Sequence, residues 1–360
     1  MPHLFEALQL RKIALPNRIG VSPMCQYSAV DGLAQDWHFI HYGSRAVAGP
    51  GLFLVEATAV TADGRISPGD MGLWHDGQIE PLARIARQMS GHGCVPGIQI
   101  AHAGRKASVG LGWQAQRALT PEERGWPVVG PSAVPFSADY AVPSELSVDA
   151  IGELVAKFVA SAQRALSAGF QVIEIHAAHG YLLHEFLSPL SNHRQDAYGG
   201  SFERRSRFLL EVTNAVRNVW PDDLPLLVRI SATDWMDGGW SVDESVELSR
   251  KLKACGVDLL DVSSGGTSPA ARIPAGPGFQ SDFAARIRRE AAIATGAVGI
   301  ITAPAQADHI IRTGQADMVF IARELLRDPY WPLHAAQALG HSVAWPNQYL
   351  RAAPPGSTGR

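Results

Sequence analysis

Short apolar stretches alternate with longer segments of helical periodicity along the whole chain. Most of these stretches are apolar almost without interruption, which is typical of parallel strands covered on both faces. Because strand and helix units alternate eight times, the pattern favours an α/β fold, the (β/α)8 TIM barrel, over an open sheet. The predicted strands are residues 17–23, 51–60, 95–102, 171–178, 224–232, 257–264, 297–302 and 316–323.

Two of the intervening helices have well-marked ends. Ser147 is a good N-cap for a helix that ends at Gly169. Ser241 and Glu244 form a capping box for the helix that ends before Gly256. The apolar positions of the first helix follow the 3.6-residue period: Ile151, Leu154, Val155, Phe158, Ala162 and Ala165.

Two segments depart from the repeat. Residues 103–145, after the third strand, are rich in Gly, Pro and Trp and are too long for a plain βα loop, which indicates a functional role. Residues 346–360 follow the last helix. We therefore predict one barrel domain, residues 1–345, with a long excursion after strand three, followed by this C-terminal segment.

Composition narrows the class of protein. The chain has 360 residues, 46% of them hydrophobic, and a net charge of −3 with scattered signs, whereas a nucleic-acid surface needs a basic stripe. The first residues lack the pattern of a secretory signal, and no run of about eighteen apolar residues predicts a membrane span. Cys25, Cys94 and Cys255 are too far apart for a disulfide framework or a CxxC site. These features predict a cytoplasmic protein.

Polar and special residues gather where the predicted strands end. The active site of an α/β barrel is built from these ends. Each residue alone is more often a satisfied core group than a functional one, but their joint placement at one rim indicates a site. They are Ser22, Pro23, Met24, Cys25 and Tyr27; Glu56, Ala57 and Thr58; Gln99 and His102; His176, His179 and Tyr181; Arg229; and Arg323.

His176 and His179 are spaced as metal ligands often are. However, the sequence "HAAH" lacks the Glu of HExxH and follows a strand, and no HxH follows strand one. A metal-dependent barrel hydrolase stays the alternative. The other interpretation is a pair of neutral-to-cationic donors that polarises one carbonyl, with Tyr181 as proton donor. That chemistry requires a hydride, which only a cofactor can supply.

The motifs resemble the Old Yellow Enzyme family of FMN-dependent ene-reductases, and most closely its thermophilic-like branch, which includes the xenobiotic reductases. The resemblance runs from about residue 4 to about residue 351, and its central stretch is highly specific. The matching stretches are "LPNRIGVSPMCQYSA", "VEATAV", "GRISPGDMGLW", "GIQIAHAGRKA", "FQVIEIHAAHGYLLHEFLSPLSNHRQDAYGGSFERRSRFLLE", "VRISATDW", "LLDVSSGG" and "FIARELLRDP".

The resemblance implies an FMN site. Arg229 would lie near flavin N1 and O2, where a fixed positive charge stabilises reduced flavin. The phosphate would lie at the loops after strands seven and eight, with Arg323. The remaining cofactor-binding residues that it implies are Ser22, Pro23, Met24, Cys25, Ala57, Gln99 and Ala322.

The resemblance also implies the reaction, which is reduction of an activated C=C bond in α,β-unsaturated carbonyl or nitro compounds. His176 and His179 would bind the substrate oxygen, Tyr181 would donate the proton, and Tyr27 would complete the pocket. Cys25 would tune the flavin. No GxGxxG in a βαβ context provides a separate dinucleotide domain, so NADPH or NADH would enter the same cavity as the oxidant.

Two further features concern the phosphate site and the C-terminus. Ala322 stands where relatives usually have Gly, and "ITAPAQ" replaces a Gly-containing loop, so the Ala backbone must keep a negative φ. Trp345, Pro346 and Tyr349 make the C-terminal segment too aromatic for a free tail. In this branch the matching segment crosses a dimer interface. We therefore expect a homodimer or homotetramer with Arg351 in the neighbour's substrate pocket, and disorder after about residue 351.

Overall fold

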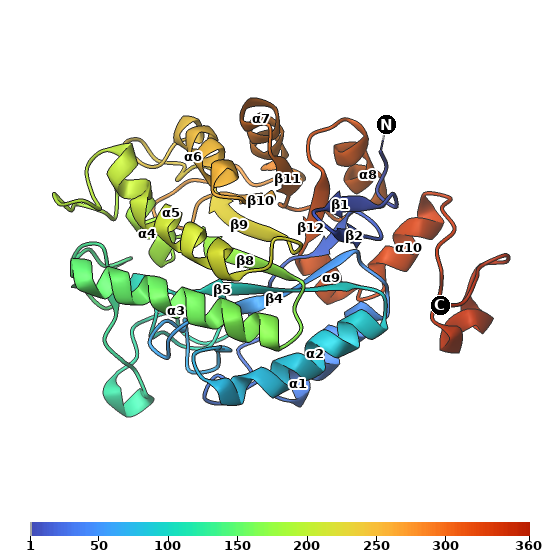
Figure 1. Ribbon diagram of the computed structural model, residues 1–360, viewed down its shortest axis with the longest axis horizontal. Coiled ribbons are helices and arrows are strands. Elements are labelled where there is room, and N and C mark those ends of the chain that lie inside the picture. Colours follow the sequence, from blue (N-terminus) through green and yellow to red (C-terminus); the bar gives the residue numbers. More distant parts are fainter. Residues whose placement is uncertain (1) are drawn as a thin grey trace.

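The computed structural model describes residues 2–360, which form a closed parallel barrel wrapped by helices (Figure 1). Within this part of the chain the eight barrel strands follow sequence order, and every neighbouring pair is parallel. The barrel prediction is confirmed. The strands are β3 (Ile19–Val21), β4 (Leu52–Ala59), β5 (Val95–Ala101), β8 (Val172–Ala177), β9 (Leu226–Ser231), β10 (Leu259–Ser263), β11 (Ala294–Ala297) and β12 (Met318–Ile321).

The helices lie on the outside of the barrel (Figure 1). Their bounds are α1 (Asp36–Ala46), α2 (Ile79–Gly91), α3 (Val148–Ser167), α4 (Leu182–Leu187), α5 (Phe202–Val219), α6 (Val242–Ala254), α7 (Ser281–Ala291), α8 (Pro304–Arg312), α9 (Arg323–Arg327) and α10 (Trp331–Ala338). Both predicted caps are confirmed. The Ser147 hydroxyl accepts the Ala150 N–H, and Ser241 with Glu244 forms the capping box of α6.

A hairpin that the sequence pattern did not reveal covers one end of the barrel. β1 (Leu8–Leu10) pairs antiparallel with β2 (Ile13–Leu15). Leu10 and Leu15 share an apolar cluster with residues at the beginning of the barrel strands, such as Leu52 and Leu259. Strands of three residues are too short for alternation to show. This apolar closure leaves the opposite end, where the strands terminate, for polar groups.

The position predicted for strand seven is wrong. The strand is β11, Ala294–Ala297, and most of the apolar run 297–302 is the loop that follows it. Two residues of this loop have positive φ, Gly299 (+129°) and Ile300 (+49°), which a strand does not allow. Within β11, Gly296 has no side chain because Phe320 of β12 occupies the interior beside it. A Cβ added at Gly296 would lie 2.3 Å from the Phe320 ring.

The excursion after the third strand packs over the end of the barrel where the strands terminate. It contains η2 (Gly104–Lys106), η3 (Pro121–Glu123) and the small sheet of β6 (Val129–Gly130) and β7 (Ser144–Glu145). Its apolar residues form a separate cluster against which Cys25 and Tyr181 pack. The excursion therefore borders the predicted site.

The C-terminal segment folds back on itself. After η4 (Asn347–Ala352), the Arg360 N–H donates to the Trp345 carbonyl at 3.0 Å. The Arg360 guanidinium donates to the carbonyl of Val47, in the link that enters β4. Backbone pairing and this contact thus place the last residues beside the chain's own barrel, and the disorder expected after residue 351 stays a prediction. Docking against a second chain stays a prediction.

The packing of Phe320 predicts opposite effects for two Gly-to-Ala substitutions. Gly296→Ala places a methyl inside the Phe320 ring and should destabilise the fold by about 1–3 kcal/mol. Gly152 lies in α3 and a Cβ there meets nothing within 4 Å, so Gly152→Ala should stabilise by about 0.5–1 kcal/mol. Denaturant unfolding measures both. Equal effects of the two substitutions would contradict the packing of Phe320 against Gly296.

Candidate active site

His176 and His179 stand together at the end of β8. The strand ends at Ala177, and His179 turns back with φ +59°, a left-handed conformation that needs support in a non-glycine residue. Its N–H donates to Ser231 Oγ at 2.9 Å, and its carbonyl accepts from Lys106 Nζ at 2.8 Å. The two imidazole centroids are 5.2 Å apart and the rings are nearly perpendicular.

Both imidazoles are neutral at neutral pH. Burial, followed by the charge of Arg229, lowers the pKa of His176 and of His179 well below the usual value. His176 Nδ1 accepts the Ala178 N–H at 3.3 Å, which leaves the proton on Nε2. His179 Nε2 lies 2.7 Å from Ser263 Oγ. The pair therefore offers neutral imidazoles. The sequence had left the charge of the two side chains open between neutral and cationic, and burial selects the neutral form.

Tyr181 lies beside the pair. Its ring centroid is 5.0 Å from that of His176. Burial raises the pKa of its phenol well above the usual value, so the side chain keeps its proton. The Lys106 ammonium lies 5.0 Å from the Tyr181 ring centroid, and burial lowers the pKa of Lys106 to about 8. An O–H donor thus stands next to two N–H donors.

The loop after β3 carries Cys25, and a hydrogen bond to the buried Glu56 carboxyl group fixes its backbone. Glu56 Oε2 accepts the Gln26 N–H at 2.8 Å, and Glu56 Oε1 accepts the Tyr42 hydroxyl at 2.7 Å. Burial, then Asp70 and Glu56, raise the pKa of the Cys25 thiol well above its usual value. The side chain is therefore a thiol rather than a nucleophilic thiolate.

Tyr27 faces the excursion. Its backbone is left-handed, with φ +52°, and its ring meets Trp113 edge-on at 6.1 Å between centroids. Burial raises the pKa of Tyr27 beyond the usual range, with Cys25 as the next cause. Gly112 allows this approach, because a Cβ there would lie 2.4 Å from the Tyr27 ring.

Polar groups also fill the barrel interior below the histidines. Arg229 Nη1 donates to Ser22 Oγ at 3.1 Å, so strands β9 and β3 are joined across the barrel end. Gln99 Nε2 donates to Glu174 Oε1 at 2.7 Å. Ala57 lines a small gap together with Tyr181. The structure therefore brings the predicted cofactor residues of five strands to the same end of the barrel as the histidine pair.

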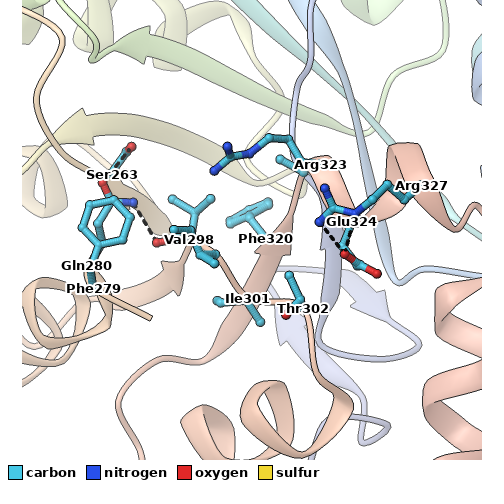
Figure 2. A pocket seen from close by; sticks show the side chains of 13 residues that line it. Ser263, Phe279, Gln280, Val298, Ile301, Thr302, Phe320, Arg323, Glu324 and Arg327 are labelled. Carbon is cyan, nitrogen blue, oxygen red and sulfur yellow. Dashed lines mark hydrogen bonds and ion pairs between the residues drawn. The ribbon is translucent and has the colours of Figure 1, made fainter. Parts of the chain in front are cut away.

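A cavity of about 340 Å³ opens beside this polar layer. It lies between the ends of β10, β11 and β12, and Figure 2 shows the Arg323 side chain extending toward its Ser263 side. Arg327 on the same wall is paired with Glu324 at 2.6 Å, whereas Arg323 has no acidic partner in residues 2–360. Ala322 has φ −107°, so its backbone keeps the negative φ that was expected for an alanine at this position.

The geometry adds residues that the sequence reasoning missed. Ser263 ends β10, lines the cavity and contacts His179, so it joins the cavity to the histidine pair. The strand-end criterion, applied to residues 257–264, would have found it. Lys106 follows the third strand on η2, and only its contacts reveal its place. Arg351 is exposed on η4, in the segment that contacts the opposite end of the barrel, and the single chain does not bring it to the site.

Residues 2–360 contain neither a candidate metal centre nor a helix suited to span a membrane. Across residues 2–360, no three His, Cys, Asp or Glu side chains are grouped so that they could hold a metal ion. In the same part of the chain, no helix combines the length and the apolar character that a membrane crossing requires.

Comparisons with known proteins agree with this geometry. The NADPH dehydrogenase of Geobacillus sp. (strain WCH70) is 50% identical over 350 residues, 97% of this chain and 98% of the relative. That of Listeria innocua serovar 6a is 48% identical over 98% and 99% of the two chains. Morphinone reductase in complex with tetrahydroNAD superposes with a TM-score of 0.79 at 26% identity, covering 96% of this chain and 93% of that one. Residues 3–341 match the family described as NADH:flavin oxidoreductase / NADH oxidase. The chain belongs to this family of flavin oxidoreductases, the Old Yellow Enzymes.

Proposed function

We propose that this oxidoreductase is an FMN-dependent ene-reductase that takes reducing equivalents from NADPH or NADH. Its substrates are α,β-unsaturated carbonyl or nitro compounds. One observation carries the proposal: two neutral imidazoles and a protonated phenol stand at the same end of the barrel as Arg229, Gln99 and the cavity below Arg323.

The residues present fit FMN. Arg323 is a cation without an acidic partner in residues 2–360, beside a cavity bounded by backbone of the loop after β11, which suits a phosphate. Arg229 is nearly buried, its Nε lies 3.2 Å from Asp261 Oδ2 and its Nη1 donates to Ser22, so the guanidinium end lies at the barrel end where it can meet an electron-rich ring edge. FMN would supply the hydride, which no side chain can. Ser22, Gln99 and Arg229 would hold the ring, with Pro23, Met24, Cys25 and Ala57 beside it.

The imidazoles bind the acceptor oxygen. A neutral N–H donor polarises a carbonyl or nitro group, and its strength grows as negative charge develops on the oxygen. The perpendicular rings can approach one oxygen from two directions. Tyr181 is the proton donor, because its phenol is neutral and adjoins His176. Tyr27, whose ring meets Trp113 edge-on, would complete the pocket.

The reductant and the assembly follow from the relatives and the tail. The similar proteins from Geobacillus and Listeria are named NADPH dehydrogenases, so we assign NADPH as the reductant, with NADH as the alternative. Arg351 lies far from its own site, so it completes the pocket of a second copy in a homodimer or homotetramer. We place the enzyme in the cytoplasm, acting on small molecules.

FMN content is the first test. Heat-released cofactor should chromatograph as FMN and not as FAD, because the cavity of about 340 Å³ beside Arg323 suits a terminal phosphate. Arg323→Ala should weaken FMN binding at least about tenfold, since a charge-assisted contact to phosphate is lost. Arg327→Ala is the matched control, because Glu324 already engages that guanidinium. FAD in the protein, or equal effects of both variants, would refute the phosphate site.

The histidine pair is the second test. His176→Ala and His179→Ala should each keep FMN bound and lower turnover of 2-cyclohexenone about 100-fold, because an N–H donor to the developing oxyanion is lost. Phenol binding, followed by the flavin absorbance, should weaken as well. His309→Ala, on the exposed face of α8, is the control. Unchanged rates in both pair variants would show that the imidazoles do not hold the oxygen.

The C-terminal segment is the third test. Truncation before Trp345 should lower activity and weaken association together, while Arg351→Ala should lower activity at unchanged oligomeric mass. Arg360→Ala is the control, since that side chain contacts its own barrel. Light scattering and steady-state rates measure both quantities. Full activity and unchanged mass after truncation would contradict a shared site.

A further inference from the structure

Four charged or amide side chains form a layer inside the barrel, one step below the histidines. Gln99 pairs in register with Glu174, and Arg229 pairs with Asp261. Three residues of the layer each lie two positions before a residue of the site on the same strand. Glu174 precedes His176, Arg229 precedes Ser231, and Asp261 precedes Ser263. Residues two apart on a strand share a face, so this layer lies directly beneath the site. All four side chains are buried, with at most 6% exposed.

The layer holds one guanidinium and two carboxyl groups. Arg229 Nε lies 3.2 Å from Asp261 Oδ2, but the N–H is not aligned with the oxygen. Within residues 2–360 neither Asp261 oxygen accepts a hydrogen bond. The charge of Asp261 is therefore opposed mainly by Arg229. Glu174 differs, because one of its oxygens accepts from Gln99 at 2.7 Å.

The two carboxyl groups have different protonation states. Burial raises the pKa of Glu174 well above its usual value, and the neighbouring charge of Asp261 adds to the effect. Burial raises the pKa of Asp261 only to about 6, because Arg229 opposes the shift. At neutral pH Asp261 is thus ionised and Glu174 holds a proton. The layer then contains one positive and one negative charge, which suits an interior with few hydrogen bonds.

We propose that Asp261 and Glu174 are positioning residues for the flavin: Asp261 limits the positive field that Arg229 exerts on the ring, and Glu174 fixes the direction of the Gln99 amide. The proposal rests on the proposed function, which places FMN above Arg229 and Gln99. Neither residue touches the substrate. Their effect is on the midpoint potential of the bound flavin and on its affinity.

The direction of the effect follows from charge. Asp261→Asn keeps the size of the side chain and removes the anion, so the field of Arg229 at the ring becomes more positive. A more positive field favours the reduced flavin, which carries more negative charge. We expect the equilibrium constant between oxidised and reduced flavin to shift at least tenfold toward the reduced form. For a two-electron couple this raises the midpoint potential by at least about 30 mV. Glu174→Gln exchanges a neutral acid for a neutral amide. It should change the equilibrium constant between oxidised and reduced flavin less than twofold, which is a shift of less than about 9 mV in the midpoint potential.

The experiment measures the midpoint potential of purified holoenzyme by equilibration with a reference dye. Asp258→Asn is the matched control, because this carboxylate lies at the other end of β10 and pairs with Arg11 at 2.7 Å. It should lose stability and keep the wild-type potential. A potential of Asp261→Asn within about 9 mV of wild type, or below it, would overturn the role of Asp261. A rise in Glu174→Gln as large as that in Asp261→Asn would overturn the assigned protonation.

A second measurement covers the case in which Asp261→Asn does not fold. Glu174→Ala removes the acceptor of the Gln99 amide and should weaken FMN binding about tenfold, with Glu174→Gln restoring most of the affinity, as expected for one lost hydrogen bond to a buried donor. Equal affinities of Glu174→Ala and wild type would refute the role of Glu174. A wild-type protein without FMN would refute the proposed function itself, whereas a wild-type holoenzyme with unresponsive variants would refute only this inference.

Discussion

The site depends on closure of the barrel between β12 and β3. Ile321 pairs with Val21, so the end of the last strand lies against the start of the Ser22–Tyr27 loop. Phe320 fills the interior at this seam, and it fits because both neighbours are glycine: a Cβ at Gly20 would lie 2.6 Å from its ring and one at Gly296 2.3 Å. Without this closure Ser22 could not accept the hydrogen bond of Arg229, and the predicted cofactor residues of the two chain halves would not meet.

Burial then sets the chemistry of the groups that closure brings together. The imidazoles of His176 and His179 lose their charge, while the Tyr181 phenol and the Cys25 thiol keep their protons. Desolvation is the largest cause in every case, so the site consists of neutral donors around the fixed charge of Arg229. Neutral donors bind a neutral carbonyl without a large desolvation cost, and they bind more strongly as negative charge develops. Proton donation by Tyr181 is consistent with the same condition.

The sequence predicted the barrel, the long excursion and both helix caps, because each has a local signal in periodicity or in cap residues. It misplaced strand seven, since the strand is short and contains Gly296, which the volume of Phe320 requires, while the loop after it is apolar. It also missed the role of Lys106. A lysine that donates to the carbonyls of His179 and Gly266 can be recognised only when chain segments far apart in sequence are placed together. The contact between Trp345 and Arg360 is likewise not local, so the tail sequence alone could not reveal it.

The departures from the family pattern fall on loops, whereas the matching groups lie both on strands and on the loops that follow them. Gln99, His176 and Arg229 are fixed by the hydrogen-bonded register of the barrel, so their spacing tolerates little change. Ala322 and the loop after β11 lie outside that register. Ala322 has a negative φ of −107°, whereas Gly299 in the loop after β11 has φ +129°, a conformation that favours glycine. The cavity beside Arg323 is thus bordered in part by loop residues that the barrel register does not fix, whereas Gln99, His176 and Arg229 stand on strands that it does fix.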